Sequence, residues 1–589
     1  MDQRSDQAAT VDPPPAAGTA DPRATAAILD EFLREPQIAY FSMEIALRDD
    51  IPTYAGGLGV LAGDTVRSAA DLGVPMVAVS LVSRAGYFRQ GFDSQGRQTQ
   101  TAQRWDPQQF ARPMGAKVAL LIEDRVVWVR SWLYMAQGLA GHRRPVILLD
   151  TDLEENQAAD REITHHLYGG DEAYRLKQEM VLGIGGVRTL NALGFQIRQY
   201  HLNEGHSALL ALELLHRYAR SPEEAGVGPI YDIPRVRELC NFTTHTPIEA
   251  GHDQFAYDLV QRIMGEFIAQ PVLKSLAGEE RLNMTRLALN LSEFVNGVGR
   301  RHAEVSRRAF PGYHIHAVAN GVHPCTWTCD SFTQLYDGRL RGWRHEPELL
   351  VRVDQIPDGA LWEAHLAAKR TLIARVKTLT GTSLAVELPI LGFGRRMTAY
   401  KRPDLLFWDL ERLKNIARKR PFQIVMAGKA HPRDGSGGQL IEALHRYQKE
   451  LAGVVPIAFL PDYGMRLALE MVSGCDVWLN TPLPPLEASG TSGMKAAFNG
   501  VPSLSVLDGW WLDGCIEGIT GWAIGDSSEH SRGEDAISLY DKLENVVLPL
   551  YQSAPQGWIA VMKGAIGKNA SYFNSHRMMR RYATEAYIR

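Results

Sequence analysis

The sequence predicts an α/β fold in which two Rossmann-like domains face each other across a cleft. Its 589 residues, 45% of them hydrophobic, exceed what one core usually holds and suggest two large domains. A strand, a glycine-rich loop, a helix and a second strand follow one another over residues 37–82, and a similar order returns over residues 391–480. Because ligands of open α/β sheets bind beyond the carboxyl ends of the strands, two such domains would form a cleft lined by strand-to-helix loops.

The first α/β unit begins after a polar N-terminal segment. Residues 1–35 are rich in Ala, Pro, Asp and Thr, and we expect a disordered or loosely attached tail there. The apolar patterns then predict a strand at Gln37–Met43, a helix at Val60–Leu72 that Gly73 ends, and a second strand at Val74–Val82.

The second unit repeats this alternation late in the chain. A strand ends at Leu391–Phe393, and further strands are predicted at Gln423–Gly428, Ile457–Leu460 and Asp476–Asn480, with helical segments between them. No repeat with a fixed period is present, which argues against a solenoid.

Charge and composition exclude several functional classes. With 63 basic and 67 acidic residues the net charge is −4, so the chain has no excess of positive charge that would indicate binding to nucleic acid or an anionic membrane. The five cysteines form no CxxC pair and no zinc-ligand pattern, so a reduced cytosol is the default. The N-terminus has no apolar signal core, and no apolar stretch reaches the roughly 20 residues that cross a bilayer. We therefore expect a soluble, cytoplasmic protein.

The most informative motif is the run Glu487-Ala-Ser-Gly-Thr-Ser-Gly-Met-Lys495. Gly490 and Gly493 permit tight turns, and Thr491 can cap the helix that starts here. Free N–H groups at a helix start attract anions, so Lys495 would lie on a phosphate-binding turn. A Ser/Gly linker with a solvated lysine is the alternative, which the apolar, structured flanks on both sides disfavour.

Other predicted loops carry weaker signals. Gly56, Gly57 and Gly59 open a helix, which suits close approach of an anion or a sugar, although a turn required only for packing fits equally well. The segment His201–His206 lacks the HExxH spacing and a third ligand, so we predict a polar loop and no metal. His245 lies between hydroxyl side chains and is either a structural histidine or a residue of the cleft.

A cluster of cations follows the strand that ends at Phe393. Four basic residues occur within the eight residues from Arg395 to Arg402, almost without acids beside them. Such a cluster is unfavourable unless it is solvated or faces anions. A solvated helix face is the simple interpretation, but Arg395, Arg396 and Lys401 fall on the loop and first turn, where two phosphate groups could bind.

Taken together, these motifs resemble those of the glycogen or α-glucan phosphorylases in their shorter bacterial form. The match extends from about Tyr40 to about Asp526, and its shared order makes it specific. The matching segments are the Gly56–Gly59 loop, Arg175–Glu179, Asn203–His206, His245, Val295–Arg300, Asn320–Pro324, Arg395–Arg402, Gly428–Ala430 and Glu487–Lys495.

The resemblance implies the two-Rossmann GT-B glycosyltransferase fold. We expect a glucan-binding N-terminal domain over residues 36–320 and a cofactor-binding C-terminal domain over residues 321–560. By analogy with the fold, a C-terminal helix over residues 561–589 would pack back on the first domain.

The resemblance also implies pyridoxal 5′-phosphate, held as an aldimine on Lys495. Its phosphate would lie beside inorganic phosphate and help to shuttle a proton while a terminal α-1,4 bond of a glucan or maltodextrin breaks with retention. The product would be α-glucose 1-phosphate. Two neighbouring phosphates repel each other unless cations and helix-start N–H groups surround them, and the basic cluster and glycine loops supply both.

The family's functional positions transfer to this chain by motif. The catalytic residues would be Lys495, His245, Arg396 and Lys401. The cofactor would contact Lys495, Arg395, Thr491, Gly57, Trp327 and Tyr463. The substrate would contact Gly56, Gly57, Leu58, Asn320, Tyr400, Glu487, Ser489 and Gly490. Within this scheme, Arg396 and Lys401 cradle the substrate phosphate, and His245 lies near the developing oxocarbenium ion.

The chain departs from the family pattern at several positions. Glycine follows Tyr463, where better-known members have an arginine that reaches the cofactor phosphate, and Arg466 is the candidate replacement. Arg395 stands where many relatives have lysine, and Thr398 and Ala399 replace a His-Glu pair. Because the chain is shorter than the animal enzymes, we expect no nucleotide or phosphorylation control.

Two other functions compete with the phosphorylase. A nucleotide-sugar glucosyltransferase of the glycogen synthase type shares the fold and the glycine-rich loop, but there a second glutamate often follows the first after seven residues. Here Lys495 occupies that spacing from Glu487, which suits an aldehyde cofactor and not a ribose. A non-catalytic glucan-binding protein is the second alternative, and the intact cationic and lysine positions argue against it.

Overall fold

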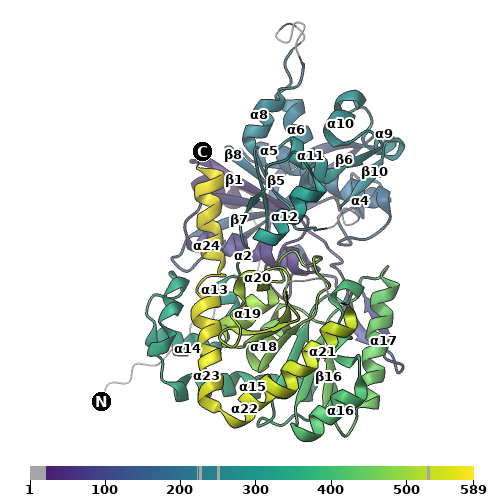
Figure 1. Cartoon of the computed structure of the whole chain (residues 1–589). Coiled ribbons are helices and arrows are strands. Elements are labelled where there is room, and N and C mark those ends of the chain that lie inside the picture. Colours follow the sequence, from purple (N-terminus) through teal and green to yellow (C-terminus); the bar gives the residue numbers. More distant parts are fainter. Residues whose placement is uncertain (1–21, 222, 224–228, 248–251, 527–530, 589) are drawn as a thin grey trace.

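Two α/β domains lie one above the other in the computed structural model of the chain, which describes residues 22–221, 223, 229–247, 252–526 and 531–588 (Figure 1). Each domain has a mostly or wholly parallel sheet with helices packed against it. The predicted fold class, two Rossmann-like domains facing a cleft, is confirmed. Among the described residues, no helix combines the length and apolar character needed to cross a bilayer.

The first domain is built on a nine-stranded sheet. In spatial order its strands are β13 (His316–Ala317), β12 (Phe294–Gly297), β9 (Cys240–Thr243), β8 (Ile197–Asn203), β1 (Gln37–Ser42), β2 (Met76–Leu81), β7 (Arg143–Asp150), β6 (Arg125–Gln137) and β5 (Arg112–Ile122). Strands β13 to β7 are parallel, and β6 and β5 extend the sheet as an antiparallel hairpin. The parallel part runs outward from β1 in both directions, which is the order of a doubly wound sheet.

Helices cover both faces of this sheet. Those of the first domain are α1 (Pro22–Leu33), α2 (Gly57–Asp71), α3 (Ala158–Arg161), α4 (Glu172–Met180), α5 (Gly186–Ala192), α6 (Leu209–Arg217), α8 (Ile233–Leu239), α9 (Tyr257–Met264), α10 (Gln270–Ala277), α11 (Met284–Asn290) and α12 (Arg300–Ala309). Side chains of β1 alternate between two cores: Phe41 joins the core under α5 and α6, and Tyr40 joins the core under α2.

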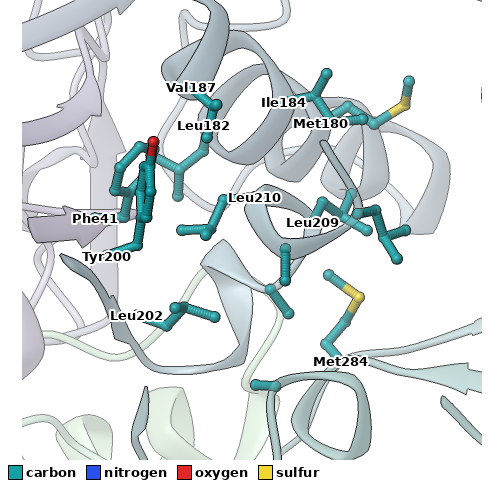
Figure 2. Packing of buried hydrophobic residues seen from close by; sticks show 14 of the residues in the cluster. Phe41, Met180, Leu182, Ile184, Val187, Tyr200, Leu202, Leu209, Leu210 and Met284 are labelled. Carbon is teal, nitrogen blue, oxygen red and sulfur yellow. The ribbon is translucent and has the colours of Figure 1, made fainter. Parts of the chain in front are cut away.

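The larger core of the first domain shows why small residues occur in its helices. Phe41 and Tyr200 lie side by side against the segment that carries Leu182 and Val187 (Figure 2). A Cβ at Gly186 would lie 2.5 Å from the ring of Phe41, so only glycine allows this helix to approach β1 so closely.

Helix α1 departs from the loose tail expected for residues 1–35. Its side chains Leu29 and Phe32 are spaced three residues apart, lie on one helix face and are buried in the first-domain core. The expectation of a loosely attached segment is therefore wrong for this helix, whereas residues 1–21 lie outside the described residues.

The second domain has a six-stranded, wholly parallel sheet. Its strands, in spatial order, are β16 (Ile457–Leu460), β15 (Gln423–Ala427), β14 (Ile390–Gly394), β17 (Val477–Asn480), β18 (Ser503–Val506) and β19 (Gly521–Ile524). This is again the doubly wound order. The main helices are α13 (Pro324–Trp327), α14 (Asp330–Arg339), α15 (Asp358–Thr380), α16 (Leu410–Lys419), α17 (Gly435–Glu450), α18 (Met465–Gly474), α19 (Ser492–Phe498), α20 (Trp511–Gly514), α21 (Arg532–Lys542), α22 (Leu548–Ser553), α23 (Pro555–Gly564) and α24 (Ser575–Tyr582).

A hairpin of the first domain, β3 (Arg89–Phe92) and β4 (Gln98–Thr101), reaches onto the second domain. Gln90 donates its backbone N–H to Asp462 Oδ1 at 3.1 Å, and its Oε1 accepts the Asp462 N–H at 3.0 Å. The Gln98 amide makes a similar reciprocal pair with the backbone of Ala430, at 2.9 and 3.0 Å. These paired bonds fix one side of the cleft.

The C-terminal helix α24 joins the domains on another side. It packs on α2 (Figure 1). At this contact the hydroxyls of Ser575 and Ser68 lie 2.6 Å apart. Beyond it, the Tyr587 hydroxyl bonds His201 Nδ1 at 2.6 Å, under the sheet of the first domain. The end of the described chain is thus part of the first-domain core.

Candidate active site

A cavity of about 670 Å³ lies between the two domains, among loops that follow the carboxyl ends of their strands. With the exception of Arg466, the structure brings every candidate site residue predicted from the sequence to its wall. These residues are Gly56, Gly57, Leu58, His245, Asn320, Trp327, Arg395, Arg396, Tyr400, Lys401, Tyr463, Glu487, Ser489, Gly490, Thr491 and Lys495. Motifs from both halves of the chain therefore share one site.

Lys495 reaches this cavity from α19, directly after the glycine-rich turn. Gly490 has a φ of +79°, which favours glycine, and a Cβ at Gly493 would lie 2.6 Å from the Trp510 ring. The Lys495 side chain is buried, and its ammonium lies 3.8 Å from the ring centroid of Trp327 without a hydrogen bond or ion pair to any described residue. Burial lowers the pKa of Lys495 to about 8, although the negative charge of Asp64 acts to raise this pKa.

Glu487 bridges two cations of the basic cluster. Its Oε2 accepts from Arg395 Nη2 and from Lys401 Nζ, each at 2.5 Å, in a buried setting. Although burial opposes ionisation, these two charges lower the pKa of Glu487 to about 2. Arg395 Nη1 is buried and has no partner among the described residues. One donor of the buried guanidinium is therefore left for a ligand.

Arg396 is an exposed cation at the wall of the cavity. Its side chain forms no hydrogen bond or ion pair with a described residue, and its Nη2 lies 3.1 Å from where a Cβ of Gly56 would be. Gly56 precedes α2, whose start has no side-chain cap, and a Cβ at Gly57 would meet no atom within 4 Å. Free helix-start N–H groups, open space and an unpaired guanidinium thus meet at one point, which is the chemistry of an anion site.

His245 is held in one tautomer at the wall of the first domain. Its Nε2–H donates to Asn203 Oδ1 at 2.7 Å, and its backbone N–H donates to Glu204 Oε2 at 2.7 Å. Burial, with nearby histidines, lowers the pKa of His245 to about 3, so the ring is neutral and Nδ1 is its acceptor. The loop that holds both partners is the polar loop predicted at His201–His206.

Besides Arg395 Nη1 and His206 Nδ1, two further buried polar atoms on the cavity wall have no partner among the described residues. They are Asn320 Oδ1 and Ser489 Oγ, on opposite domains, and each residue is less than 10% exposed. Because nearly all buried polar groups in proteins are hydrogen-bonded, such atoms beside a cavity indicate a hydroxyl-rich or otherwise polar ligand.

The tyrosines of the site have different surroundings. The Tyr463 hydroxyl donates to the Gly394 carbonyl at 3.2 Å, and burial raises the pKa of Tyr463. The ring of Tyr400 lies under Lys401 Nζ, 4.6 Å from its centroid.

Arg466, the predicted replacement for the family's arginine, pairs with Glu470 on the outer face of α18 and is 72% exposed. The prediction for Arg466 is wrong, because its position on the helix directs the side chain away from the cavity.

Several cavity residues were not predicted as site residues. They include Glu44, Tyr87, Tyr168, Arg175, Asp253 and His431. Glu44 follows the carboxyl end of β1 by two residues, a position that could have indicated it. Arg175 lies in a segment that matches the family but received no role. The remaining residues stand in loops without a recognisable motif.

Asp71, His323 and His576 form a second buried polar group, here called the junction cluster, where α2, α13 and α24 meet. Their ligand atoms lie within 4.8 Å of one another, a separation compatible with a metal ion. However, His323 Nδ1 accepts the Thr326 N–H at 3.2 Å, so the proton is on Nε2, which donates to Asp71 Oδ2 at 2.8 Å. Hydrogen bonds account for this cluster, and a metal would need the opposite tautomer of His323.

Comparison with known proteins gives a consistent result. The family model described as Carbohydrate phosphorylase matches residues 248–513. Maltodextrin phosphorylase of Thermococcus litoralis is 37% identical over 94% of this chain and 70% of its own length. Glycogen phosphorylase of Aquifex aeolicus is 36% identical over 93% of this chain and 86% of its own length. Glycogen phosphorylase of Mycobacterium tuberculosis is 35% identical, covering 93% and 70%.

Two doubly wound domains with a polar cavity between them define an enzyme of the GT-B glycosyltransferase class. Within that class, the chain belongs to the carbohydrate phosphorylase family. The resemblance inferred from the motifs is confirmed. Members of this family generally depend on pyridoxal phosphate.

Proposed function

We propose that the protein is an α-glucan phosphorylase. It transfers the terminal glucosyl unit of an α-1,4-glucan or maltodextrin to inorganic phosphate, reversibly and with retention, and gives α-glucose 1-phosphate. The relatives' names, maltodextrin and glycogen phosphorylase, support this substrate class. The observation that carries the proposal is the meeting of an unpaired Arg396 at the start of α2 with a buried Lys495 in one cavity.

The second-domain side of the cavity suits pyridoxal 5′-phosphate. The Lys495 amine would attach the cofactor, and its lowered pKa favours the neutral, nucleophilic form near pH 8. The unpaired Nη1 of buried Arg395 and the start of α19 at Thr491 would hold the cofactor phosphate. Trp327 and Tyr463 would line this side, and the backbone of Gly57 would face the cofactor from the first domain. When bound, the cofactor supplies a phosphate group that can exchange a proton with the substrate phosphate.

The substrate phosphate would bind between the domains. Arg396 provides an unpaired guanidinium, and Gly57 provides backbone N–H donors at the start of α2. Lys401, which Glu487 holds in place at 2.5 Å, adds a second charge. These groups offset the repulsion between two phosphates, and they are in position before the substrate binds, as electrostatic catalysis requires.

The glucosyl unit would occupy the space bordered by both domains. The unpartnered atoms Asn320 Oδ1 and Ser489 Oγ would bond sugar hydroxyls. His245 is neutral, and its Nδ1 would accept a hydrogen bond from a sugar hydroxyl near the positive charge that develops on the sugar ring. Glu487 can use Oε1, which makes no hydrogen bond to a described residue. Gly56, Leu58, Tyr400 and Gly490 would border the same sugar.

We place the enzyme in the cytoplasm, with glucan and phosphate as its partners and no nucleic acid or membrane partner. The five cysteines are all unpaired, as a reducing compartment favours.

Purified protein loaded with pyridoxal phosphate should release glucose 1-phosphate from maltodextrin only when inorganic phosphate is present. The reverse reaction should extend a maltodextrin primer with glucose 1-phosphate. Chain growth from a nucleotide sugar, without phosphorolysis, would instead favour a glycogen synthase-like enzyme. Binding of maltodextrin without either reaction would indicate a non-catalytic glucan-binding protein.

A further inference from the structure

Glu44 has an unusual place beside the cavity. It is 1% exposed and makes no ion pair with a described residue, yet its carboxylate accepts three hydrogen bonds. The donors are the backbone N–H of Ala55 at 2.6 Å, the backbone N–H of Gly56 at 3.0 Å and the Tyr168 hydroxyl at 3.0 Å. A buried carboxylate is unfavourable unless such donors surround it, so its position is closely defined.

Two of these bonds fix the loop that starts α2. With Ala55 and Gly56 bonded to Glu44, the next N–H groups, those of Gly57 and Leu58, are the free donors of the helix start. A Cβ at Gly59 would lie 2.7 Å from Glu44 Oε2, which explains the glycine at this position. The carboxylate therefore packs against the Ala55–Gly59 loop and fixes its backbone conformation.

The third bond ties Glu44 to Tyr168, another residue of the first domain that lines the cavity. Tyr168 has a φ of +56°, a strained conformation for a residue with a side chain, and the Arg175 guanidinium lies 4.4 Å from its ring centroid. Arg175 is itself held by Glu179 at 3.0 Å and Asp253 at 2.8 Å. A chain of contacts from α4 thus holds the hydroxyl that bonds Glu44.

Glu44 also acts on the nearby cation. Burial alone would lower the pKa of Arg396, but nearby negative charges raise it. Glu44 makes the largest of these contributions. Arg396 Nη2 in turn lies against Gly56, 3.1 Å from where a Cβ would be. The same carboxylate therefore influences both parts of the proposed phosphate site, the helix start and the guanidinium.

We propose that Glu44 is a positioning residue for phosphate, which holds the Ala55–Gly56 loop and Arg396 so that both converge on one phosphate group. It does not bind phosphate itself, because an ionised carboxylate has no donor to offer and is repelled by the negative charge of phosphate. This inference rests on the proposed function, since it assigns phosphate to the site at the start of α2.

The direct test is calorimetric titration of inorganic phosphate into the holoenzyme without maltodextrin, so that no phosphorolysis takes place during the titration. Glu44→Ala should weaken phosphate binding by about tenfold or more, and Glu44→Gln, which keeps the shape and an acceptor, should restore part of it. In steady-state assays the KM for phosphate should rise in parallel, while the KM for maltodextrin stays within about twofold. Tyr168→Phe, which removes one of the three bonds, should give a smaller change in the same direction.

Equal phosphate affinity in wild type and Glu44→Ala, or equal changes in both KM values, would overturn the role of Glu44. If Glu44→Ala does not fold, as judged by circular dichroism, Glu44→Gln and Tyr168→Phe carry the same test. A wild-type holoenzyme that binds no phosphate would overturn the proposed function and this inference with it. The two failures are therefore distinguishable.

Discussion

The active-site cavity and the junction cluster are both buried and polar, and they differ in how completely their atoms are paired. In the junction cluster, Asp71 Oδ1 accepts the Leu139 N–H at 2.7 Å and Oδ2 accepts from both histidines at 2.8 and 2.9 Å. In the cavity, Arg395 Nη1, Asn320 Oδ1 and Ser489 Oγ have no partner within the part of the chain that the structure describes. This difference in hydrogen bonding distinguishes a structural cluster from a ligand-binding site, although both contain residue types that are common in active sites.

The physical reason is the cost of an unpaired polar group. A buried donor or acceptor without a partner costs about 1–3 kcal/mol, so a fold retains several together only where a ligand completes them. A satisfied network instead contributes to stability. The comparison therefore predicts that changes in the cavity affect activity more than stability, and that changes in the junction cluster do the reverse.

The largest effect on activity is expected for Lys495→Ala. Phosphorolysis should fall by at least about 10³-fold, the upper range for loss of one preorganised catalytic group. The midpoint of thermal unfolding of the cofactor-free protein should not fall, because the Lys495 ammonium forms no ion pair with a described residue. Differential scanning calorimetry and a glucose 1-phosphate assay measure the two quantities.

Lys369 is the matched control for this variant. It is also a buried lysine, but its Nζ is paired with Asp476 Oδ2 at 2.8 Å. Lys369→Ala should lower the free energy of unfolding by about 3–5 kcal/mol, since it leaves a buried charge unpaired. Equal stability losses in the two lysine variants would contradict the comparison.

Asp71→Asn tests the junction cluster itself. The variant should lose about 3–5 kcal/mol of unfolding free energy, because it leaves buried histidine donors without a carboxylate. Its kcat/KM per folded molecule should stay within about twofold of wild type at a temperature where both are folded. Urea denaturation and the phosphorolysis assay measure these outcomes, and a selective loss of activity would show that the cluster belongs to the site.

The same variant has a defined pH dependence. Bonds from His323 and His576 hold the pKa of Asp71 below its ordinary value, although burial opposes this. A depressed folded pKa stabilises the protein above the unfolded pKa, about 3.9, and this contribution is lost as pH falls further. The stability difference between wild type and Asp71→Asn should therefore shrink between pH 6 and pH 3.

Ser489→Ala should have a smaller and purely functional effect. Its hydroxyl is buried without a partner, so removal should leave the unfolding free energy unchanged or raise it by up to about 1 kcal/mol. Loss of one hydrogen bond to the sugar should lower kcat/KM for maltodextrin by about tenfold. A clear loss of stability, measured by thermal unfolding, would mean that the hydroxyl has a protein partner.

The smallest effect is on the pH dependence of cofactor attachment. Since burial lowers the pKa of Lys495 to about 8, the neutral amine should increase about tenfold per pH unit below that value and level off above it. The rate at which cofactor-free protein takes up pyridoxal phosphate, followed by absorbance, should show this bend. A rate that keeps rising to pH 10 would indicate an ordinary lysine.

Much of this architecture was predictable from sequence, because the parallel strands and their glycine-rich loops have strong local patterns. The antiparallel hairpin of β5 and β6 was not predicted. Its two-residue turn is Glu123-Asp124, with φ of 50° and 58°, where glycine or asparagine would normally give the signal. Helix α1 was missed because its apolar face is short, with Leu29 and Phe32 buried and Ile28 and Leu33 packed beside them, and follows a long segment without apolar periodicity.

The candidate site was predictable where residues belong to motifs, and less so where single side chains act across the fold. The grouping of Lys495 with the basic cluster followed from matching segments. The position of Glu44 after the end of β1 indicated at most that it borders the cleft, since its partners at Ala55 and Tyr168 are set by tertiary structure. Arg466 shows the opposite error, because spacing from Tyr463 does not reveal the direction of a helical side chain.

The central claim is that the cavity, and not the junction cluster, is the site where a cofactor and phosphate act, with Lys495 as its attachment point. Holoenzyme should be reduced with borohydride, digested and mapped by mass spectrometry. A pyridoxyl group on the peptide that contains Lys495, absent in Lys495→Ala, is the predicted result. An unmodified Lys495 in cofactor-loaded protein would contradict the account.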